Sequence, residues 1–236
     1  MANTMGFKKA ERKQSKIKMA LLGPSGSGKT MSALLIAGGL SGGKYDTVGL
    51  IDTESSSAAL YANVTVGTQK IGEFQTLVLD PPFEVPRYVN AIKLAEECGI
   101  TTLVIDSLSH AWVGASGLLE KHNALAEKTG NSFNAWGRIT PELNKLIDAI
   151  LQSNMHVICT MRSKTEYAVD GNKVRKLGLA PMMKDGTEYE FGIVFDIGAN
   201  HQATVSKDRT GLFDGKVFIP SVDTGREILT WLNAKS

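Results

Sequence analysis

The chain has 236 residues, of which 42% are hydrophobic and 21% are charged, and its formal net charge is +2. This composition is typical of a folded globular protein, and the length suits one domain with a sizeable core. We expect no membrane contact, because no apolar run approaches the roughly 18 residues that a membrane span needs. We expect no signal peptide, because no apolar region follows the charged residues near the N-terminus. Cys98 and Cys159 form no close pair, so neither a disulfide scaffold nor a structural zinc site is expected.

Residues 1–15 are predicted to form a basic N-terminal arm, followed by a single core domain over residues 16–236. Six lysine or arginine residues fall between positions 8 and 18, and only Glu11 opposes them. Such a run of charge is either a solvated arm or a segment that contacts phosphates or a neighbouring subunit.

From residue 17 onward, short apolar runs alternate with segments of helical spacing. The predicted strands are Ile17–Leu22, Thr47–Asp52, Gln75–Leu79, Thr101–Ile105, Met155–Met161, Ile193–Ile197 and Ala203–Ser206. The predicted helices are Lys29–Leu40, Pro86–Cys98, Leu118–Lys128, Pro141–Asn154 and Arg226–Ala234. This alternation predicts an α/β fold with a mostly parallel central sheet flanked by helices. The short link between the last two strands predicts an antiparallel edge hairpin, and the polar segment Ser163–Glu190 is predicted to be a long loop.

Residues 23–30 read Gly-Pro-Ser-Gly-Ser-Gly-Lys-Thr and match the phosphate-loop pattern G-x-x-x-x-G-K-[ST]. Glycines let successive N–H groups turn toward one anion, and the helix N-terminus adds its positive end. We expect Lys29 to reach the β and γ phosphates of a nucleoside triphosphate, as a binding and catalytic group, and the Thr30 hydroxyl to ligate Mg²⁺. The predicted nucleotide contacts are Gly23, Pro24, Ser25, Gly26, Ser27, Gly28, Lys29, Thr30 and Met31.

Two acidic residues follow buried strands. Asp106 ends the apolar run Leu103–Ile105, and strand C-termini line the ligand crevice of such sheets, so Asp106 is expected to face Thr30 across the metal. Glu54 follows the strand after the phosphate-loop helix, where it can orient a water beside the γ phosphate. An alternative is that Glu54 caps a short helix near Ser55–Ser57.

With these residues the chain resembles the RecA-core family of P-loop ATPases. Asp52-Thr53-Glu54 matches the family's D-x-E, whose glutamate is catalytic, and Asp106-Ser107 matches its Walker B aspartate followed by serine. The resemblance implies a RecA-like fold, ATP as the nucleotide and a homo-oligomeric ring or filament. Through Met161–Tyr167 and Lys176–Pro181 the chain is most similar to the short phage RecA-like ATPases of single-strand annealing recombination. That likeness implies a phage protein acting in the host cytoplasm.

The resemblance also implies roles for two later segments. Val157–Arg162 resembles the family strand that carries a γ-phosphate sensor, which makes Thr160 and Arg162 the candidate sensor residues. Residues 207–211 resemble the family's K-x-[KR] element, whose cations enter the neighbouring subunit's ATP site. Lys207 and Arg209 are therefore candidates for stabilising transition-state charge in trans, unless the segment is a surface hairpin with solvated charges.

In this family the loop after the sensor strand contacts single-stranded DNA, and here it corresponds to Ser163–Lys184. Basic residues outnumber acidic ones by five to two in this segment, and an aromatic ring can stack on a base. The candidate DNA contacts are Lys164, Tyr167, Lys173, Arg175 and Lys176. The segment can instead be a solvated flap or a lid over the nucleotide. The loop predicted over Gly114–Trp136 is a second candidate contact, through Lys121, Lys128 or Trp136, although a tryptophan also suits the core.

The predicted function is Mg²⁺-dependent ATP hydrolysis, stimulated by single-stranded DNA, in an oligomer active in recombination or annealing. A single-strand-binding protein is a further candidate partner. Two alternatives stay open: a replication loader or accessory factor without DNA binding of its own, and a small-molecule P-loop kinase whose lid is the basic loop.

Overall fold

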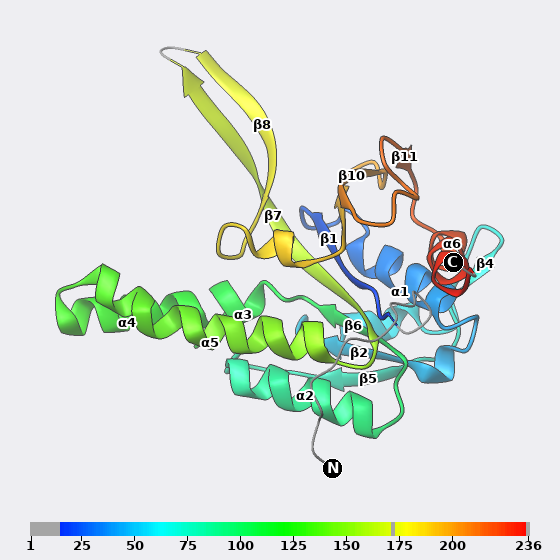
Figure 1. Cartoon of the computed structure of the whole chain (residues 1–236), viewed down its shortest axis with the longest axis horizontal. Coiled ribbons are helices and arrows are strands. Elements are labelled where there is room, and N and C mark those ends of the chain that lie inside the picture. Colours follow the sequence, from blue (N-terminus) through cyan, green and yellow to red (C-terminus); the bar gives the residue numbers. More distant parts are fainter. Residues whose placement is uncertain (1–14, 171–172, 235–236) are drawn as a thin grey trace, which may run out of the picture.

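The computed structural model describes residues 15–170 and 173–234, with side chains throughout except at 165–179. Its centre is a sheet with the strand order β11-β10-β9-β1-β7-β6-β2-β5, and β8 pairs with the outer part of β7 (Figure 1). All pairings from β9 to β5 are parallel, whereas β10, β11 and β8 pair in antiparallel fashion. The parallel strands are β1 (Lys18–Gly23), β2 (Val48–Asp52), β5 (Gln75–Val78), β6 (Thr102–Asp106), β7 (His156–Asp170) and β9 (Ile193–Ile197). The antiparallel ones are β8 (Lys173–Pro181), β10 (Ala203–Asp208) and β11 (Val217–Phe218), and β3 (Thr65–Val66) with β4 (Gln69–Lys70) forms a separate ribbon.

Both faces of the sheet are buried, because successive side chains on a strand point to opposite faces. On β1, Met19 and Leu21 join one apolar cluster, and Ala20 and Leu22 join the other. Helices α1 (Lys29–Leu40) and α6 (Val222–Asn233) cover the first face. Helices α2 (Val85–Glu97), α3 (His110–Val113) and α5 (Ser132–Gln152) cover the second, with α4 (Leu118–Thr129) packed on α5 (Figure 1). The expected α/β fold is confirmed, and so is the antiparallel β9–β10 edge hairpin.

The crossing of α1 and α6 depends on two glycines. A Cβ atom on Gly39 would lie 2.1 Å from the carbonyl oxygen of Val222, and one on Gly225 would lie 2.1 Å from that of Ile36. Both distances are far shorter than a van der Waals contact, so the two backbones touch where any larger residue would separate them. This contact fixes α6 on the helix that begins at the phosphate loop.

Two predicted helix boundaries are wrong. Helix α5 begins at Ser132 and not at Pro141, because the side chain of Asn131 accepts a hydrogen bond from the Asn134 N–H at 3.0 Å and caps an earlier start. Pro141 therefore lies inside the helix. Helix α6 begins at Val222, four residues before the predicted start, behind a capping box that Ser221 forms with the third helical residue.

The helix predicted over Leu118–Lys128 is confirmed as α4. With the first turn of α5 it occupies most of residues 114–136, so the loop expected over that range is wrong. Trp136 packs against the apolar cluster on this face of the sheet. Its ring stacks on His122 with centroids 3.8 Å apart and on Trp112 at 5.7 Å. Within the described residues, no helix combines the length and apolar character needed to cross a membrane.

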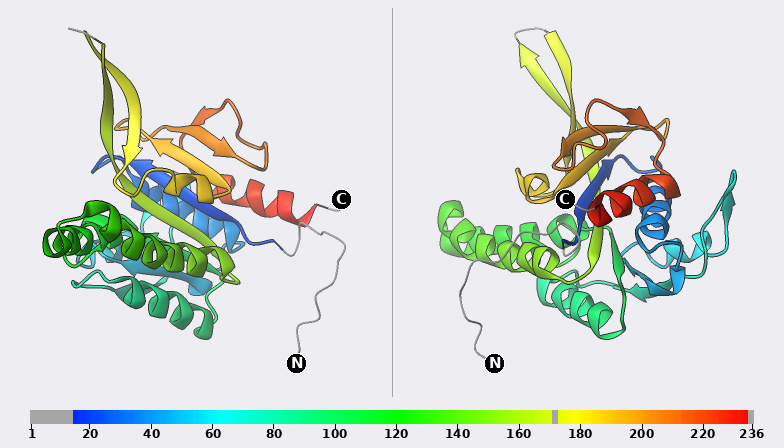
Figure 2. Two further views of the ribbon diagram at one scale, coloured as in Figure 1. Left: turned by 60° about the vertical axis from the view of Figure 1, so that its left-hand side comes forward. Right: turned by 45° about the vertical axis from the view of Figure 1, so that its right-hand side comes forward.

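The loop predicted over Ser163–Lys184 is a β-hairpin instead. Strand β7 continues to Asp170, and β8 returns in antiparallel register, with Ser163 opposite Pro181 and one irregularity after Glu166. The alternation of Thr165, Tyr167 and Val169 is a strand pattern of β-branched and aromatic residues, which the polar character of the segment obscured. Figures 1 and 2 show this hairpin extending away from the sheet as a two-stranded arm.

Candidate nucleotide-binding site

The phosphate loop joins the end of β1 to the start of α1. Its backbone has positive φ at Gly26 (78°) and Gly28 (87°), a region that residues with a Cβ rarely adopt. A Cβ on Gly23 would meet Ser27 Oγ at 2.4 Å, so the loop is also too tight there for a side chain. The three glycines of the pattern are therefore required by backbone conformation or by lack of space. The loop ends at the N-terminus of α1, where free N–H groups can bind an anion.

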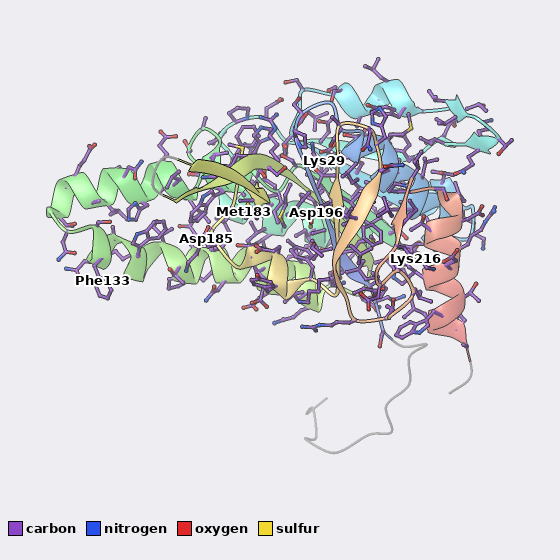
Figure 3. The ribbon with its side chains drawn as sticks, turned by 90° about the horizontal axis from the view of Figure 1, so that it is seen from above. Lys29, Phe133, Met183, Asp185, Asp196 and Lys216 are labelled. Atoms are coloured by element: carbon purple, nitrogen blue, oxygen red, sulfur yellow. The ribbon has the colours of Figure 1, made fainter. Side chains whose placement is uncertain are left out.

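Lys29 lies folded across this loop, with only 8% of its surface exposed. Its Nζ donates a hydrogen bond to the carbonyl oxygen of Pro24 at 2.8 Å. Burial lowers the pKa of Lys29, and the carboxylates of Asp106 and Glu54 partly offset that effect. The ammonium group thus lies over the loop near two carboxylates, and bound phosphates would replace the Pro24 carbonyl as its partner. Figure 3 shows Lys29 near the middle of the molecule, between the green helices α4 and α5 on one side and α6 on the other.

Asp106 ends β6 beside the loop, as expected, and is 3% exposed. Its Oδ2 accepts a hydrogen bond from the Thr30 hydroxyl at 2.5 Å, and its Oδ1 accepts one from the Thr160 hydroxyl. Burial raises the pKa of Asp106, and these two hydroxyl donors partly offset it. Hydroxyl and carboxylate oxygens are ligands that Mg²⁺ prefers, so Thr30 and Asp106 fit that ion. Within the described residues no group of three His, Cys, Asp or Glu side chains is arranged to hold a metal.

The turn after β2 is held by Asp52, which is 1% exposed. Its two carboxylate oxygens accept hydrogen bonds from the backbone N–H groups of Glu54, at 2.7 Å, and Ala58, at 3.0 Å. Asp52 is thus the anchor of the turn, and Glu54 extends from it with 32% of its side chain exposed.

Glu54 and Arg162, predicted separately as site residues, form an ion pair. Glu54 Oε1 accepts hydrogen bonds from Arg162 Nη2 at 2.8 Å and Nε at 3.1 Å. Thr160 and Arg162 come from β7, which lies between β1 and β6, so this one strand contacts both acidic residues of the site. Both residues are predicted from sequence to lie at the γ phosphate, and their pairing with each other is a finding of the structure.

Two histidines that the sequence analysis did not select also support the site. His110 Nδ1 lies 2.6 Å from the Thr53 hydroxyl, which accepts a hydrogen bond from the Ser107 N–H at 2.7 Å. Burial lowers the pKa of His110. His201, between β9 and β10, donates from Nδ1 to the Ser27 carbonyl at 3.0 Å and so braces the phosphate loop. Neither histidine belongs to a recognisable local motif, because each partner is distant in sequence.

A cavity of about 610 Å³ opens beside the phosphate loop. Its mostly apolar walls include Gly28, Met31, Leu35, Tyr61, His201, Ile219 and Pro220. This volume lies within the range of small-molecule sites, and the position next to the loop suits the base and ribose of a nucleotide whose phosphates lie on the loop.

A family model described as an AAA domain matches residues 15–230. The chain belongs to this family. No curated protein matches the chain. Among solved structures it is similar to a KaiC-like protein from the hyperthermophilic archaeon Pyrococcus horikoshii OT3, at 17% identity over 82% of this chain and 79% of that one, with a TM-score of 0.45. This AAA domain has an α/β fold with a mostly parallel central sheet, in which the phosphate loop follows β1, Glu54 follows β2, Asp106 ends β6, and β7 lies between β1 and β6.

The AAA domain places Lys207 and Arg209 on the edge hairpin of the sheet. Lys207 lies near the end of β10, where its Nζ donates a hydrogen bond to the carbonyl oxygen of Tyr189 in the same chain. Arg209 follows the strand and is exposed. The action of these two residues on a neighbouring subunit stays a prediction.

The candidate DNA contacts of the AAA domain all lie on the β7–β8 hairpin. Lys164 is exposed at its root. The side chains of Tyr167, Lys173, Arg175 and Lys176 fall outside the described part of the structure, although the strand register places Tyr167 opposite Lys176. Residues 1–14 of the predicted N-terminal arm also lie outside the described residues.

Proposed function

We propose that this AAA domain binds and hydrolyses ATP with Mg²⁺, and that it does so as an oligomer that holds single-stranded DNA on its β7–β8 hairpin during recombination or annealing. The observation that carries the proposal is the convergence of Lys29, Asp106 and Glu54 on one edge of the sheet. The AAA family membership supports the nucleotide-binding and ATPase part. The likeness of residues 161–167 to phage recombination ATPases supports the setting, a phage protein in the host cytoplasm.

In the proposed reaction, Lys29 and the loop amides would hold the β and γ phosphates, and Thr30 with Asp106 would hold Mg²⁺. The bound ion would neutralise charge on the phosphates. The oxygen of a water attacks the γ phosphorus while Glu54 accepts a proton from that water. The bond from the γ phosphorus to the bridging oxygen breaks, its electron pair stays with ADP, and inorganic phosphate leaves. Lys207 and Arg209 of a neighbouring copy would stabilise the charge that develops in this step.

Charge and position support the DNA part. The segment 163–184 carries a surplus of three positive charges, and Lys164 at its root is exposed. Basic surfaces hold the phosphate backbone, and stacking on aromatic rings such as that of Tyr167 holds bases without sequence preference. The hairpin also continues the strand that contacts Asp106 and Glu54, so DNA on the hairpin would act on a strand of the ATP site. A single-strand-binding protein would then be a partner that presents or receives the strand.

The ATPase assignment is tested by phosphate release from ATP in wild type and Glu54→Gln, with Glu97→Gln as the matched control because Glu97 is exposed on α2. Removing a general base typically costs 10²–10⁴-fold in rate, so Glu54→Gln is expected to lose at least about 100-fold and Glu97→Gln almost nothing. Equal rates in wild type and Glu54→Gln would refute the catalytic assignment. A phosphorylated small molecule among the products would instead support the kinase alternative.

The DNA assignment is tested by shortening the hairpin. Lys164 and Ala180 are directly opposed, so residues 165–179 can be replaced by Asn-Gly, a pair suited to a two-residue hairpin turn. We expect this variant to lose salt-dependent binding of single-stranded DNA while it keeps DNA-free ATP hydrolysis. Unchanged DNA binding would remove the hairpin from the proposal. If the intact protein binds no single-stranded DNA with or without ATP, the loader alternative takes its place.

A further inference from the structure

His201 lies in the turn between β9 and β10, beside the phosphate loop. The turn is closed by two hydrogen bonds, from the Gly198 N–H to the Gln202 carbonyl oxygen at 2.9 Å and from the His201 N–H to the Gly198 carbonyl oxygen at 3.0 Å. His201 has a φ of 63°, in the left-handed region that residues with a Cβ seldom adopt. The turn therefore holds the imidazole in a fixed direction at a small cost in backbone energy, which is a common feature of functional sites.

The Nδ1 atom of His201 faces the phosphate loop and donates to the Ser27 carbonyl oxygen at 3.0 Å. A Cβ on Gly28 would lie 3.0 Å from Nδ1 but 3.8 Å from both of its neighbours in the ring, so the Nδ1 vertex is the part nearest the loop. In a planar trans peptide the C=O and N–H groups point in opposite directions. Holding the Ser27 carbonyl therefore also fixes the direction of the Gly28 N–H, one of the groups expected to face bound phosphates.

The second ring nitrogen of His201, Nε2, is a hydrogen-bond acceptor. A carbonyl oxygen can only accept a hydrogen bond, so Nδ1 must carry a proton, and Nε2 of the neutral ring then carries none. Nε2 lies on the ring edge away from Gly28, and within the described part of the chain the only hydrogen bond of this ring is the one from Nδ1. Because His201 lines the cavity of about 610 Å³, it brings a free acceptor to the cavity wall.

The position of this acceptor suits the ribose of a nucleotide. The ribose joins the phosphates to the base, and His201 contacts the phosphate loop on one side and lines the cavity expected to hold the base on the other. The 2′ and 3′ hydroxyl groups of a ribose are donors that a bare imidazole nitrogen can accept. Apolar side chains such as Met31, Leu35 and Ile219 line the same cavity and suit the faces of a base.

We propose that His201 is a specificity-determining residue whose Nε2 accepts a hydrogen bond from a ribose hydroxyl, so that the site prefers ribonucleotides to deoxyribonucleotides. This inference rests on the proposed ATPase function and names the class of nucleotide that the site takes. The contact is a hydrogen bond between neutral groups at an exposed residue. Its expected contribution is about two- to tenfold in affinity, which corresponds to about 0.4–1.4 kcal/mol at 1.4 kcal/mol per tenfold.

The test is calorimetric binding of ADP, 2′-deoxy-ADP and 3′-deoxy-ADP in the presence of Mg²⁺, because these diphosphates carry the sugar but are not hydrolysed. Wild type should bind at least one deoxy analogue about two- to tenfold more weakly than ADP. In His201→Asn the ratio should fall to about one, since asparagine readily adopts the left-handed conformation but has no second ring nitrogen. Gln202→Ala is the matched control: its exposed side chain contacts Asn200 in the same turn, and it should keep the wild-type ratio.

Binding of pyrophosphate separates the two nitrogens of His201, because pyrophosphate has no sugar and reports on the phosphate loop alone. His201→Asn loses the bond to Ser27 and should bind pyrophosphate more weakly, but this loss is shared by all three diphosphates and leaves their ratio free to report the ribose contact. His201→Phe keeps a flat ring without nitrogen atoms, and its ratio should also fall to about one. Weaker pyrophosphate binding with an unchanged ratio would mean that His201 only braces the loop, and would overturn the proposal.

The ribose contact is equally overturned if wild type binds ADP and both deoxy analogues with the same affinity. Failure of the proposed function is a different result, in which wild type binds neither ADP nor pyrophosphate.

Discussion

His156 provides a test of how the base of β7 is built. The residue begins β7, is 7% exposed, and accepts a hydrogen bond from the Ile17 N–H through Nδ1 at 3.1 Å. Burial, together with the nearby cations Lys16 and Lys18, lowers its pKa from 6.5 to about 4. Between these two values the unfolded chain binds a proton that the folded chain does not. The free energy of unfolding must therefore fall as the pH falls through this window.

The magnitude follows from the two pKa values. A difference of about 2.5 units has a limiting value of about 3.4 kcal/mol, and near pH 5 about 2 kcal/mol of it is already lost. His156→Asn removes the titration and keeps an acceptor oxygen for the Ile17 N–H. Urea unfolding near pH 7.5 and near pH 5 should show that wild type loses about 2 kcal/mol more than His156→Asn.

The exposed His201 supplies the control. His201→Asn removes an imidazole but leaves His156 in place, so this variant should lose as much stability as wild type over the same range. The fall in unfolding free energy between pH 7.5 and pH 5 can instead be the same in wild type and His156→Asn, within about 0.5 kcal/mol. In that case the fold does not keep His156 neutral, and the explanation given for its lowered pKa is wrong.

Two further substitutions test the packing of α6 and the anchor of the Glu54 turn. In Gly225→Ala the new Cβ would lie 2.1 Å from the Ile36 carbonyl oxygen, so this variant should lose about 1–3 kcal/mol of unfolding free energy. Gly137 lies inside α5 with nothing within 4 Å of a Cβ, so Gly137→Ala should gain about 0.5–1 kcal/mol. Equal effects of the two substitutions would contradict the close contact between α1 and α6. Asp52→Asn places an amide donor against one of two backbone N–H groups, so it should lower the unfolding free energy by about 1–3 kcal/mol and slow ATP hydrolysis. The exposed Asp46→Asn is the control and should do neither. Normal hydrolysis in Asp52→Asn would show that the turn does not need this anchor.

The features that sequence predicted well are those whose cause is local. The phosphate loop is specified by glycines within eight residues, and the positive φ angles at Gly26 and Gly28 show why they are needed. The places of Asp106 and Glu54 follow from the ends of apolar runs, because parallel strands align their C-termini at one edge. The central sheet was predicted from short apolar runs that alternate with helical segments, and each of these is also a local pattern.

The features that sequence missed depend on partners far along the chain. Glu54 and Arg162 are separated by 108 positions, and their contact requires β7 to lie between β1 and β6. The hairpin was mistaken for a loop because its strands are polar and lack the apolar run by which a buried strand is recognised. The early start of α5 depends on the Asn131 cap, which outweighed the expectation that Pro141 begins a helix.

The position of β7 explains why one strand contacts both acidic residues of the candidate site. Thr160 and Arg162 are two residues apart on an extended strand and so point to the same side, one toward Asp106 and the other toward Glu54. Thr160 is fully buried, and its carbonyl oxygen accepts a hydrogen bond from the Leu108 N–H at 3.0 Å, so that end of the strand is fixed. Arg162 is half-exposed and leads into the hairpin. One strand therefore holds both acidic residues of the candidate site, Asp106 through a buried contact and Glu54 through a partly exposed one.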